Sequence, residues 1–505
     1  MKIPLIVAIA GACVPLLFLQ FAVAGVVNPR LRTDRSVDTR SARTIVRALV
    51  KPGMTNEEEA LAIFHWLRRV VYHSGPEEPM RHDFNKMINV FGYGSCYMQT
   101  HPLSHLYGQV GFPCRDCMHD GHHMIEVFYD GAWHCLDPHM TFYAYNRATP
   151  RAIASIKQLQ DDPSLAMDAA KEKRTGPAFL ICGDSPKWFA GKQGRWVQHD
   201  FDTHVGADEE FGAIRLPRGT RYVLTWKTGK FYKPHAFSKD GKTGPYHTCG
   251  VGSDRKDTVN WPYWEPYVEG GHGRHYGTGY LEYAPDLRGG GWKDGAIRVS
   301  NLVSDSTDAA PGLRPDSREM PGEVIFRVDC PYVITAAELR LKGRLNWVND
   351  TIAISISKEW AGRRRKWQTV ARISGKDFST NAVAVEQDLG EAVAGSMKGY
   401  WVRVVLGSKD PRTSPSCITE LKLRSDFQLN PYALPQLLPG KNRLYATAAR
   451  CDGPWKFRIA WMDGEGWKKL REYKATLRGT SDEETIEAAG PKFPRMETIE
   501  FSVDP

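Results

Sequence analysis

The apolar residues of this chain recur at helical spacing near the N-terminus and at strand spacing in most of the remainder. Between residues 55 and 72 the apolar positions lie three or four residues apart, which predicts an amphipathic helix: Leu61, Phe64, Leu67 and Val71. Thr55 and Glu58 have the capping-box spacing that starts a helix. Residues 149–173 also have a helical pattern. From about residue 178 the strand pattern dominates, so we expect a change from helix to sheet there.

The strand pattern consists of short runs in which apolar and polar residues alternate. Such runs predict strands at 221–226, 323–328, 333–341, 351–356, 399–405 and 456–461. Short strands repeated along a chain are typical of β-sandwiches. We therefore expect one sandwich over residues 313–427. The strands after it form either a small sandwich or a sheet that completes the previous one.

Residues 121–138 have the pattern of a β-hairpin. Asp130-Gly131 is a strong signal for a two-residue type I′ turn. If these residues form the turn, Tyr129 pairs with Ala132, and counting along both strands brings Met124 opposite Asp137.

This register places one of two neighbouring histidines beside the aspartate. Side chains alternate along a strand, so His122 shares a face with Asp137 while His123 points to the other face. His122 and Asp137 become diagonal neighbours, within reach of a long side chain. The register therefore selects His122 as the partner of Asp137. The alternative is a surface hairpin whose histidines are incidental.

Cys96 lies in the segment Gly92-Tyr-Gly-Ser-Cys96, just before a stretch with helical character. Gly92 and Gly94 allow a sharp backbone turn into that helix, and Pro102 is expected to shorten or bend it. A helix N-terminus and a nearby imidazolium both lower the pKa of a thiol. A thiol, an imidazole and a carboxylate are the parts of a cysteine nucleophile system, in which His122 is the base and Asp137 orients it. The alternative for Cys96 is a buried thiol or half of a disulfide.

These residues resemble the motifs of the transglutaminase-like superfamily. The resemblance covers residues 50–147 and rests on Cys96, on Gly111-Phe-Pro-Cys-Arg115, on the helix at 55–67, and on the series His122, Glu126, Asp130-Gly131, Trp133 and Asp137-Pro138. It implies a catalytic triad of Cys96, His122 and Asp137. Tyr97, Glu126 and Trp133 lie in or beside the motifs and are candidate substrate-binding residues.

The resemblance implies a multidomain α+β fold class, in which a transglutaminase-like, papain-like α+β core precedes mainly β domains of the β-sandwich type. A chain of 505 residues is too long for one ordinary core. The expected parts are a catalytic domain at 25–177, an irregular β-rich domain at 178–312, a sandwich at 313–427 and a C-terminal β-rich domain at 428–505.

The N-terminus has the features of an export signal. Lys2 precedes an apolar run over residues 3–27, and Ala22-Val-Ala24 is a small-x-small cleavage pattern. Residues 1–24 are therefore expected to be a signal peptide of an exported protein. The alternative is a retained membrane anchor.

The cysteines are compatible with export. Removing Cys13, in the signal, and the nucleophile Cys96 from the ten cysteines leaves eight, an even number suited to disulfides: Cys114, Cys117, Cys135, Cys182, Cys249, Cys330, Cys417 and Cys451. Cys330 with Cys417 is one expected pair. Cys114 and Cys117 form a CxxC that could be a zinc site, a redox pair, a disulfide or two unpaired thiols, and the missing second CxxC argues against zinc.

The function expected from these features is that of an exported thiol enzyme that cleaves or transfers an amide or peptide acyl group, with hydrolysis favoured over cross-linking. It needs no cofactor or metal, and its substrate is a protein, peptide or glycoconjugate. The alternatives are a carbohydrate-active protein whose sandwiches bind polysaccharide, and a catalytically silent scaffold. The formal charge of +9 is mild for this length, so nucleic acid is not an expected partner. Residues 235–292 are rich in Gly, His, Tyr and Trp and could bind sugar or simply pack a loop-rich domain.

Overall fold

The computed structural model describes residues 25–73, 83–94, 96–119, 122–172, 197–199, 209–227, 231–233, 247–249, 277–306, 312–317, 319–358, 366–379, 381–396, 398–407, 416–463, 467–490 and 493–505. The expected signal at 1–24, Cys182 and the aromatic stretch at 250–276 lie outside the described residues. Among the described residues, no helix combines the length and the apolar character needed to cross a membrane.

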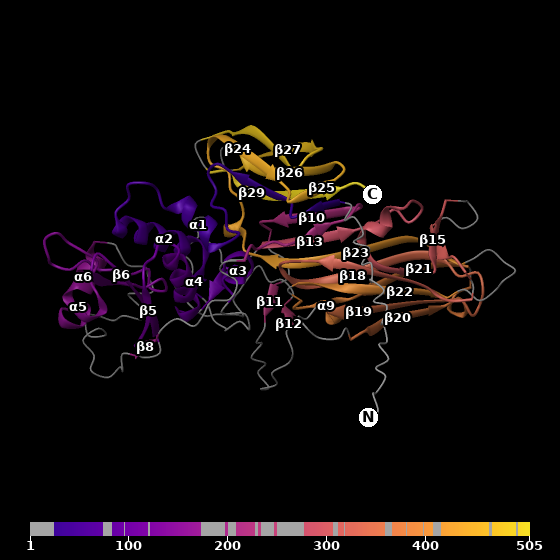
Figure 1. The fold of residues 1–505 in the computed structure, drawn as a ribbon, viewed down its shortest axis with the longest axis horizontal. Coiled ribbons are helices and arrows are strands. Elements are labelled where there is room, and N and C mark those ends of the chain that lie inside the picture. The colour runs from indigo at the N-terminus through magenta and orange to yellow at the C-terminus, as the bar shows by residue number, and fades with distance from the viewer. Residues whose placement is uncertain are drawn as a thin grey trace, which may run out of the picture.

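The described chain is mostly β, and the predicted fold class, a papain-like α+β core followed by β domains, is wrong. The longer helices lie at one end of the molecule, and strands make up most of the rest of the described chain (Figure 1). The first two strands of the described chain, at residues 25–27 and 30–33, pair with strands of the C-terminal region. Local periodicity identifies strands but not their partners, so this interleaving could not be read from the pattern.

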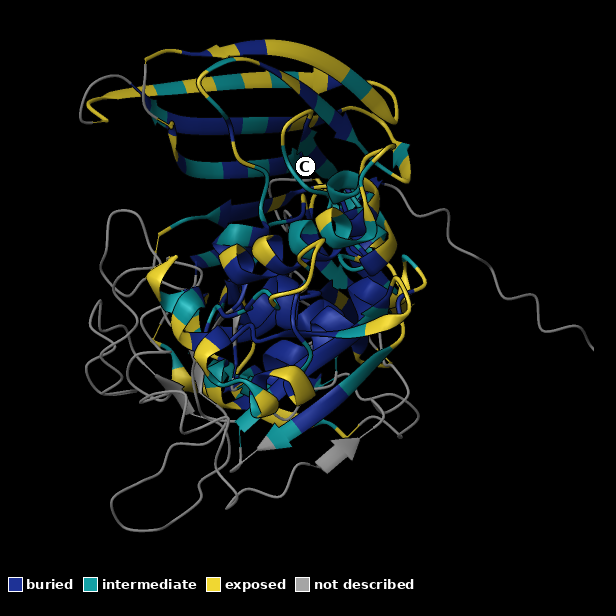
Figure 2. Ribbon diagram, turned by 90° about the vertical axis from the view of Figure 1, so that its left-hand side faces the viewer, coloured by how far each residue is buried: buried dark blue, intermediate teal, exposed yellow. Residues whose placement is uncertain are grey.

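The helical end is built around α1 (Ala42–Leu49), α2 (Asn56–Val70) and α4 (Cys96–Gly108). The predicted capping box of α2 is confirmed, because Thr55 and Glu58 each bond to the other's backbone. Buried helical residues fill the centre of this end (Figure 2). A four-stranded sheet belongs to the same end of the molecule. Its order is β7-β6-β5-β8, with β7 (Ala132–Leu136), β6 (His122–Tyr129), β5 (Cys114–His119) and β8 (Val197–His199).

The helix predicted over 149–173 is shorter than expected. Of the described residues 149–172, only α5 (Ile156–Asp161) and α6 (Ser164–Lys171) are helical, and they are separated by Asp162 and Pro163. Proline disfavours helical backbone in the residue before it, which ends α5 there. The apolar faces of both helices and of the hairpin form a small core of their own, which includes Met124 and Cys135.

Two sheets form a sandwich on the side of the molecule opposite the longer helices (Figure 1). The larger has the order β15 (Leu302–Asp305), β16 (Gly312–Pro315), β23 (Cys417–Leu429), β13 (Gly277–Tyr283), β10 (Thr220–Thr225), β29 (Arg495–Val503), β26 (Trp455–Asp463) and β27 (Lys469–Leu477). Strand β18 (Val333–Arg344) pairs with β23 and with β21 (Ala382–Asp388). The second sheet is β14 (Ala296–Ser300), β17 (Gly322–Asp329), β22 (Gly399–Gly407), β19 (Thr351–Lys358) and β20 (Gln368–Ser374).

The two sheets meet through buried side chains. The Tyr400 hydroxyl on β22 lies 2.8 Å from the Ser425 hydroxyl on β23, and Tyr283 on β13 contacts Phe326 on β17 edge to face. All six predicted strands are present. They are β10, β17, β18, β19, β22 and β26.

The C-terminal strands form a smaller layer together with the first strands of the described chain. One three-stranded sheet has the order β25 (Arg450–Asp452), β1 (Gly25–Val27), β9 (Arg215–Leu216), and the other β2 (Arg30–Thr33), β24 (Gly440–Thr447), β28 (Ser481–Ala488). Two short pairs complete the strands: β3 (Tyr72–His73) with β4 (Tyr93–Gly94), and β11 (Phe231–Lys233) with β12 (His247–Cys249).

Asn430, just after β23, anchors the segment that leads to Cys96. Its side-chain amide donates to the carbonyls of Val70 and Ile88, at 2.9 and 2.7 Å. Ile88 belongs to the π-helix η1 (Met87–Phe91), which follows the single-turn helix α3 (Phe84–Lys86). Gly92 ends this π-helix with a φ of 64°, and a Cβ there would lie 2.5 Å from Cγ of Asn430. The sandwich therefore sets the backbone path into α4.

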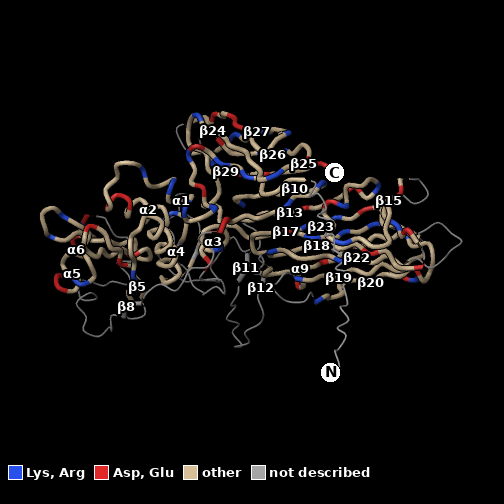
Figure 3. Tube along the Cα trace, in the orientation of Figure 1, with Lys and Arg blue, Asp and Glu red and all other residues tan. Residues whose placement is uncertain are grey.

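Short helical segments also occur among the sandwich strands. They are α9 (Gly390–Val393), η4 (Gly291–Gly295), η5 (Gly375–Asp377) and η6 (Pro431–Ala433). Basic and acidic residues are interspersed over all parts of the described chain (Figure 3). Many face each other across strands, as Arg221 and Glu500 do at 3.0 Å. This mixing argues against a single large basic face among the described residues.

Candidate active site

The hairpin forms with the predicted register. Tyr129 pairs with Ala132, and the ladder continues to Ile125 opposite Leu136. Asp130 and Gly131 have φ values of 49° and 74°, as a type I′ turn requires.

The register brings His122 to Asp137. Nε2 of His122 lies 2.7 Å from Oδ2 of Asp137, whose side chain is fully buried. The other carboxylate oxygen of Asp137 accepts a hydrogen bond from the backbone N–H of Met140 at 2.9 Å. A bridge between Asp137 and Phe142 fixes the backbone at this position. The carboxylate is therefore held in place from two sides and directs Nε2 of the imidazole.

Cys96 is the first residue of α4, and a hydrogen bond joins its side chain to that of His122. Because Asp137 occupies Nε2, Nδ1 is the ring nitrogen left for the thiol proton. Cys96 is half-buried. The expected shortening of this helix does not occur, because α4 continues through Pro102 to Gly108. The thiol thus lies at the N-terminus of a helix of full length, where N–H groups and the helix dipole favour negative charge.

The surroundings of His122 favour its protonated form. Burial by itself lowers the pKa of His122, but the Asp137 carboxylate and the Cys96 side chain together raise the pKa to about 10. A histidine held between two acidic groups is an imidazolium at neutral pH.

A second histidine, which the sequence pattern did not single out, lies against this pair. Nδ1 of His139 lies 3.3 Å from Nδ1 of His122, and the two rings meet edge to face with centroids 4.9 Å apart. His139 is buried. The hairpin register could not place His139, because the residue lies beyond the end of the paired strands. Its position directly after Asp137-Pro138 was the one sequence feature that brought it near the site.

Tyr97 lies beside the site. Its ring contacts the ring of His123 with centroids 4.9 Å apart. Nδ1 of His123 bonds to the buried Asp116 carboxylate at 2.7 Å. The two neighbouring histidines are thus bound to different carboxylates, as the alternation of the strand requires. Tyr97 remains half-buried and adjacent to Cys96.

Glu126 and Trp133, the other two candidate substrate residues, meet at Arg115. Nε of Arg115 donates to Oε2 of Glu126 at 2.7 Å, and the guanidinium carbon lies 4.1 Å from the centre of the Trp133 ring. The other oxygen of Glu126 accepts from the backbone N–H of Ile156 at 2.8 Å. Because Glu126 is buried and its carboxylate is bonded on both oxygens, it ties the hairpin to α5.

The other described cysteines differ from Cys96 in their surroundings. Every cysteine for which the structure describes the side chain is a free thiol, so the expected Cys330–Cys417 disulfide is not found. Cys114 and Cys117 are also two unpaired thiols, one of the outcomes weighed for the CxxC. Burial raises the pKa of both. In the described part of the chain, no group of three or more His, Cys, Asp or Glu side chains is arranged to hold a metal ion.

Comparisons with known proteins add little. No family model matches the sequence, and no curated protein matches it significantly. Among solved structures the chain is similar to an allantoicase, at 8% identity over 43% of this chain and 88% of the other, with a TM-score of 0.21. A β-glucuronidase of Lactobacillus rhamnosus aligns at 14% identity over 34% of this chain, with a TM-score of 0.12.

A second β-glucuronidase, from Bacteroides uniformis, aligns at 10% identity over 55% of this chain, with a TM-score of 0.13. The chain covers 30% and 28% of the lengths of these two glucuronidases. Such low TM-scores carry no argument about fold or function.

Proposed function

We propose that this chain is an exported thiol enzyme that cleaves an amide or peptide bond through Cys96, His122 and Asp137. The observation that carries the proposal is the hydrogen-bonded series from the Cys96 thiol through the His122 ring to the buried Asp137 carboxylate. A nucleophile, a base and a group that orients the base are what acyl transfer by a cysteine needs.

In the first step the Cys96 thiolate attacks the carbonyl carbon of the substrate, and the electron pair of the C=O bond moves to the oxygen. The backbone N–H groups at the start of α4 stabilise this oxyanion. The oxyanion collapses, the C–N bond breaks, and the His122 imidazolium gives its proton to the leaving amine. The product of this step is a thioester on Cys96 and a neutral His122.

In the second step a water molecule attacks the thioester while His122 takes its proton. The C–S bond breaks, which releases a carboxylic acid and restores the thiolate–imidazolium pair. Asp137 keeps Nε2 of His122 in place through both steps and stabilises the imidazolium. Water needs no binding subsite of its own, whereas a second amine does. Hydrolysis is therefore favoured over transfer to an amine. Protein, peptide and glycoconjugate amides are the substrate class.

Alkylation of Cys96 tests the proposal. The purified protein is treated with iodoacetamide between pH 5 and pH 9, and the rate at each cysteine is read by peptide mass spectrometry. We expect Cys96 to react faster than the other cysteines at pH 6, because a helix N-terminus and a neighbouring imidazolium both favour the reactive form of a thiol. Cys451 is the internal control, since it is also a half-buried free thiol but belongs to β25, away from His122.

His122→Ala removes the imidazolium and should bring the pH dependence of Cys96 labelling to that of Cys451. Slow labelling of Cys96 at pH 6 in the wild type would rule out the thiol mechanism. Cleavage of a polysaccharide that survives Cys96→Ala would instead favour a carbohydrate-active protein with a different site.

A further inference from the structure

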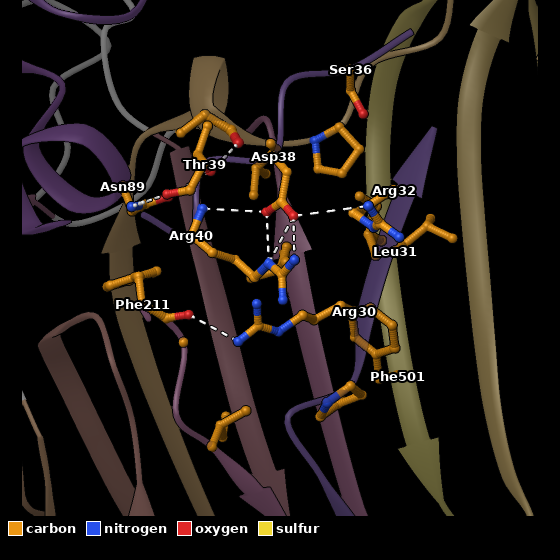
Figure 4. A pocket seen from close by; sticks show the side chains of 18 of the residues that line it. Arg30, Leu31, Arg32, Ser36, Asp38, Thr39, Arg40, Asn89, Phe211 and Phe501 are labelled. Carbon is orange, nitrogen blue, oxygen red and sulfur yellow. Dashed lines mark hydrogen bonds and ion pairs between the residues drawn. The ribbon is translucent and has the colours of Figure 1, made fainter. Parts of the chain in front are cut away.

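A pocket away from Cys96 lies where β2, β10 and β29 meet the loop before α1 (Figure 4). Its volume is about 110 Å³. One wall is charged and comes from the N-terminal segment: Arg30, Arg32, Asp38 and Arg40. The other wall is apolar and comes from the sandwich and the segment after η6: Tyr222, Leu224, Tyr332, Leu434, Ile499 and Phe501.

Arg30 has hydrogen-bonding capacity that the described residues do not use. Its Nη2 donates to the backbone oxygen of Phe211 at 3.2 Å and lies 3.4 Å from Glu210. Its Nη1 is buried and has no hydrogen-bond partner among the described residues. A buried guanidinium N–H without an acceptor costs about 1–3 kcal/mol, so an acceptor at this position would be strongly favoured.

A second guanidinium lies next to Arg30 (Figure 4). Arg40 is bound to Asp38 through Nε at 2.8 Å and faces Arg30 with its positive charge. Burial lowers the pKa of Arg30, and the neighbouring charge of Arg40 lowers it further. Two guanidinium groups side by side in a half-buried pocket are the arrangement that binds an anion between them.

The net charge of the side chains around the pocket indicates how many negative charges a bound ligand carries. Three arginines, Arg30, Arg32 and Arg40, face two carboxylates, Asp38 and Glu210. The cluster therefore keeps one positive charge, which a monoanion neutralises and a dianion would exceed. This balance favours a carboxylate over a phosphate.

The apolar wall indicates that the ligand has an apolar part as well as a charged group. Tyr222 and Phe501 stack with ring centroids 5.9 Å apart, and Leu224 and Ile499 are buried beside them. A cavity of about 150 Å³ with apolar walls holds a benzene ring. The pocket here is smaller, at about 110 Å³, so it suits a short aliphatic body and not an aromatic ring.

From these observations we propose that the pocket binds a small organic carboxylate. Its carboxylate accepts hydrogen bonds from Arg30 and lies against the charge of Arg40, and its apolar body lies on the wall formed by Tyr222, Leu224 and Ile499. The site is separate from the thiol centre and does not depend on the proposed enzyme activity.

Calorimetric titration of the whole chain with butyrate tests this site, with butyramide as the uncharged analogue of the same shape. We expect saturable binding of one butyrate per chain and none of butyramide. Arg30→Gln should weaken butyrate binding by about tenfold or more, since hydrogen bonds to charged groups contribute about 1.5–3 kcal/mol. Arg221→Gln is the matched control, because Arg221 belongs to β10, which lines the pocket, but its side chain pairs with Glu500.

Leu224→Phe provides a second test that leaves the arginines in place. The larger side chain fills the apolar part of the pocket, so butyrate binding should be lost while acetate still binds. Absence of saturable binding for acetate, propionate and butyrate alike would overturn the proposal and leave the pocket to water. Tighter binding of inorganic phosphate than of butyrate would overturn the assignment to a carboxylate.

Discussion

His139 places its Nδ1 3.3 Å from Nδ1 of His122, on the same ring nitrogen that the Cys96 thiol needs. Only one hydrogen can lie between two nitrogens at this distance. When His122 is an imidazolium, its Nδ1–H can therefore donate either to the Cys96 sulfur or to His139. His139 competes with the thiolate for one proton.

Replacing His139 with phenylalanine removes this competitor and keeps a ring of similar size. We expect the pH midpoint of Cys96 alkylation to shift by about 0.7 pH unit, because one hydrogen bond of about 1 kcal/mol is redistributed. The midpoint should fall, since His122 then donates to the Cys96 sulfur alone. His123→Phe is the control, because His123 bonds to Asp116 instead. A higher midpoint in His139→Phe would mean that His139 supports the pair rather than competing with it.

The raised pKa of His122 predicts a pH dependence of stability. The folded pKa of about 10 lies above the ordinary value of 6.5, so protonated His122 stabilises the folded state. This contribution is fully present below about pH 6.5 and is lost as the pH rises through about 10. Urea unfolding should therefore show wild type more stable than His122→Gln by about 2–4 kcal/mol at pH 6, with the difference shrinking by pH 10.

Arg221→Gln serves as the control for this pH series. Because the guanidinium of Arg221 stays charged throughout, its replacement should have an effect on stability that does not change between pH 6.5 and pH 10. A difference between wild type and His122→Gln that stays constant over this range would contradict the assignment.

The local part of the site could be predicted from the sequence because a two-residue turn fixes every pairing in its hairpin. Asp130-Gly131 alone determines which residues of 122–136 face each other, and hence that His122 rather than His123 reaches Asp137. His139 could not be found in this way, since the ladder ends before it. The alternation indicates which face of β6 carries Glu126, but not that its carboxylate bonds to Arg115 and to the backbone of α5.

The fold class failed for a related reason. Each predicted strand is present, but a strand pattern carries no information about a partner hundreds of residues away. The pairing of Arg30 with Thr447 and of Val26 with Cys451 builds the first strands into C-terminal sheets. The first strands of the expected α+β core are therefore part of the C-terminal sheets.

Glu126 is expected to act on stability and not on the thiol. Glu126→Gln removes the charge that Arg115 binds in a buried position, which should lower the free energy of unfolding by about 2–4 kcal/mol. Alkylation of Cys96 at pH 7 should be unchanged, because Glu126 does not contact Cys96 or His122 in the structure. Glu500→Gln, which removes an exposed pair with Arg221, should cost less than about 1 kcal/mol. Loss of activity at unchanged stability would instead assign Glu126 to the substrate.

The close approach of Gly92 and Asn430 predicts that a change in the sandwich alters the reactivity of Cys96. Asn430→Ala leaves the carbonyls of Val70 and Ile88 without their donor and should lower the free energy of unfolding by about 2–4 kcal/mol. The segment between η1 and α4 loses its anchor, so the rate of Cys96 alkylation at pH 6 should fall as well. Urea unfolding and alkylation of the same samples measure both effects.

Gly92→Ala should be destabilising for two reasons, and only one of them depends on Asn430. The positive φ of Gly92 costs about 1 kcal/mol for any other residue. The new Cβ would also lie 2.5 Å from Cγ of Asn430. In the double variant Gly92→Ala/Asn430→Ala the clash is relieved, while the cost of the positive φ remains. The sum of the two single losses in the free energy of unfolding should therefore exceed the loss in the double variant by at least about 1 kcal/mol. Strict additivity would show that the two residues do not meet in the folded protein.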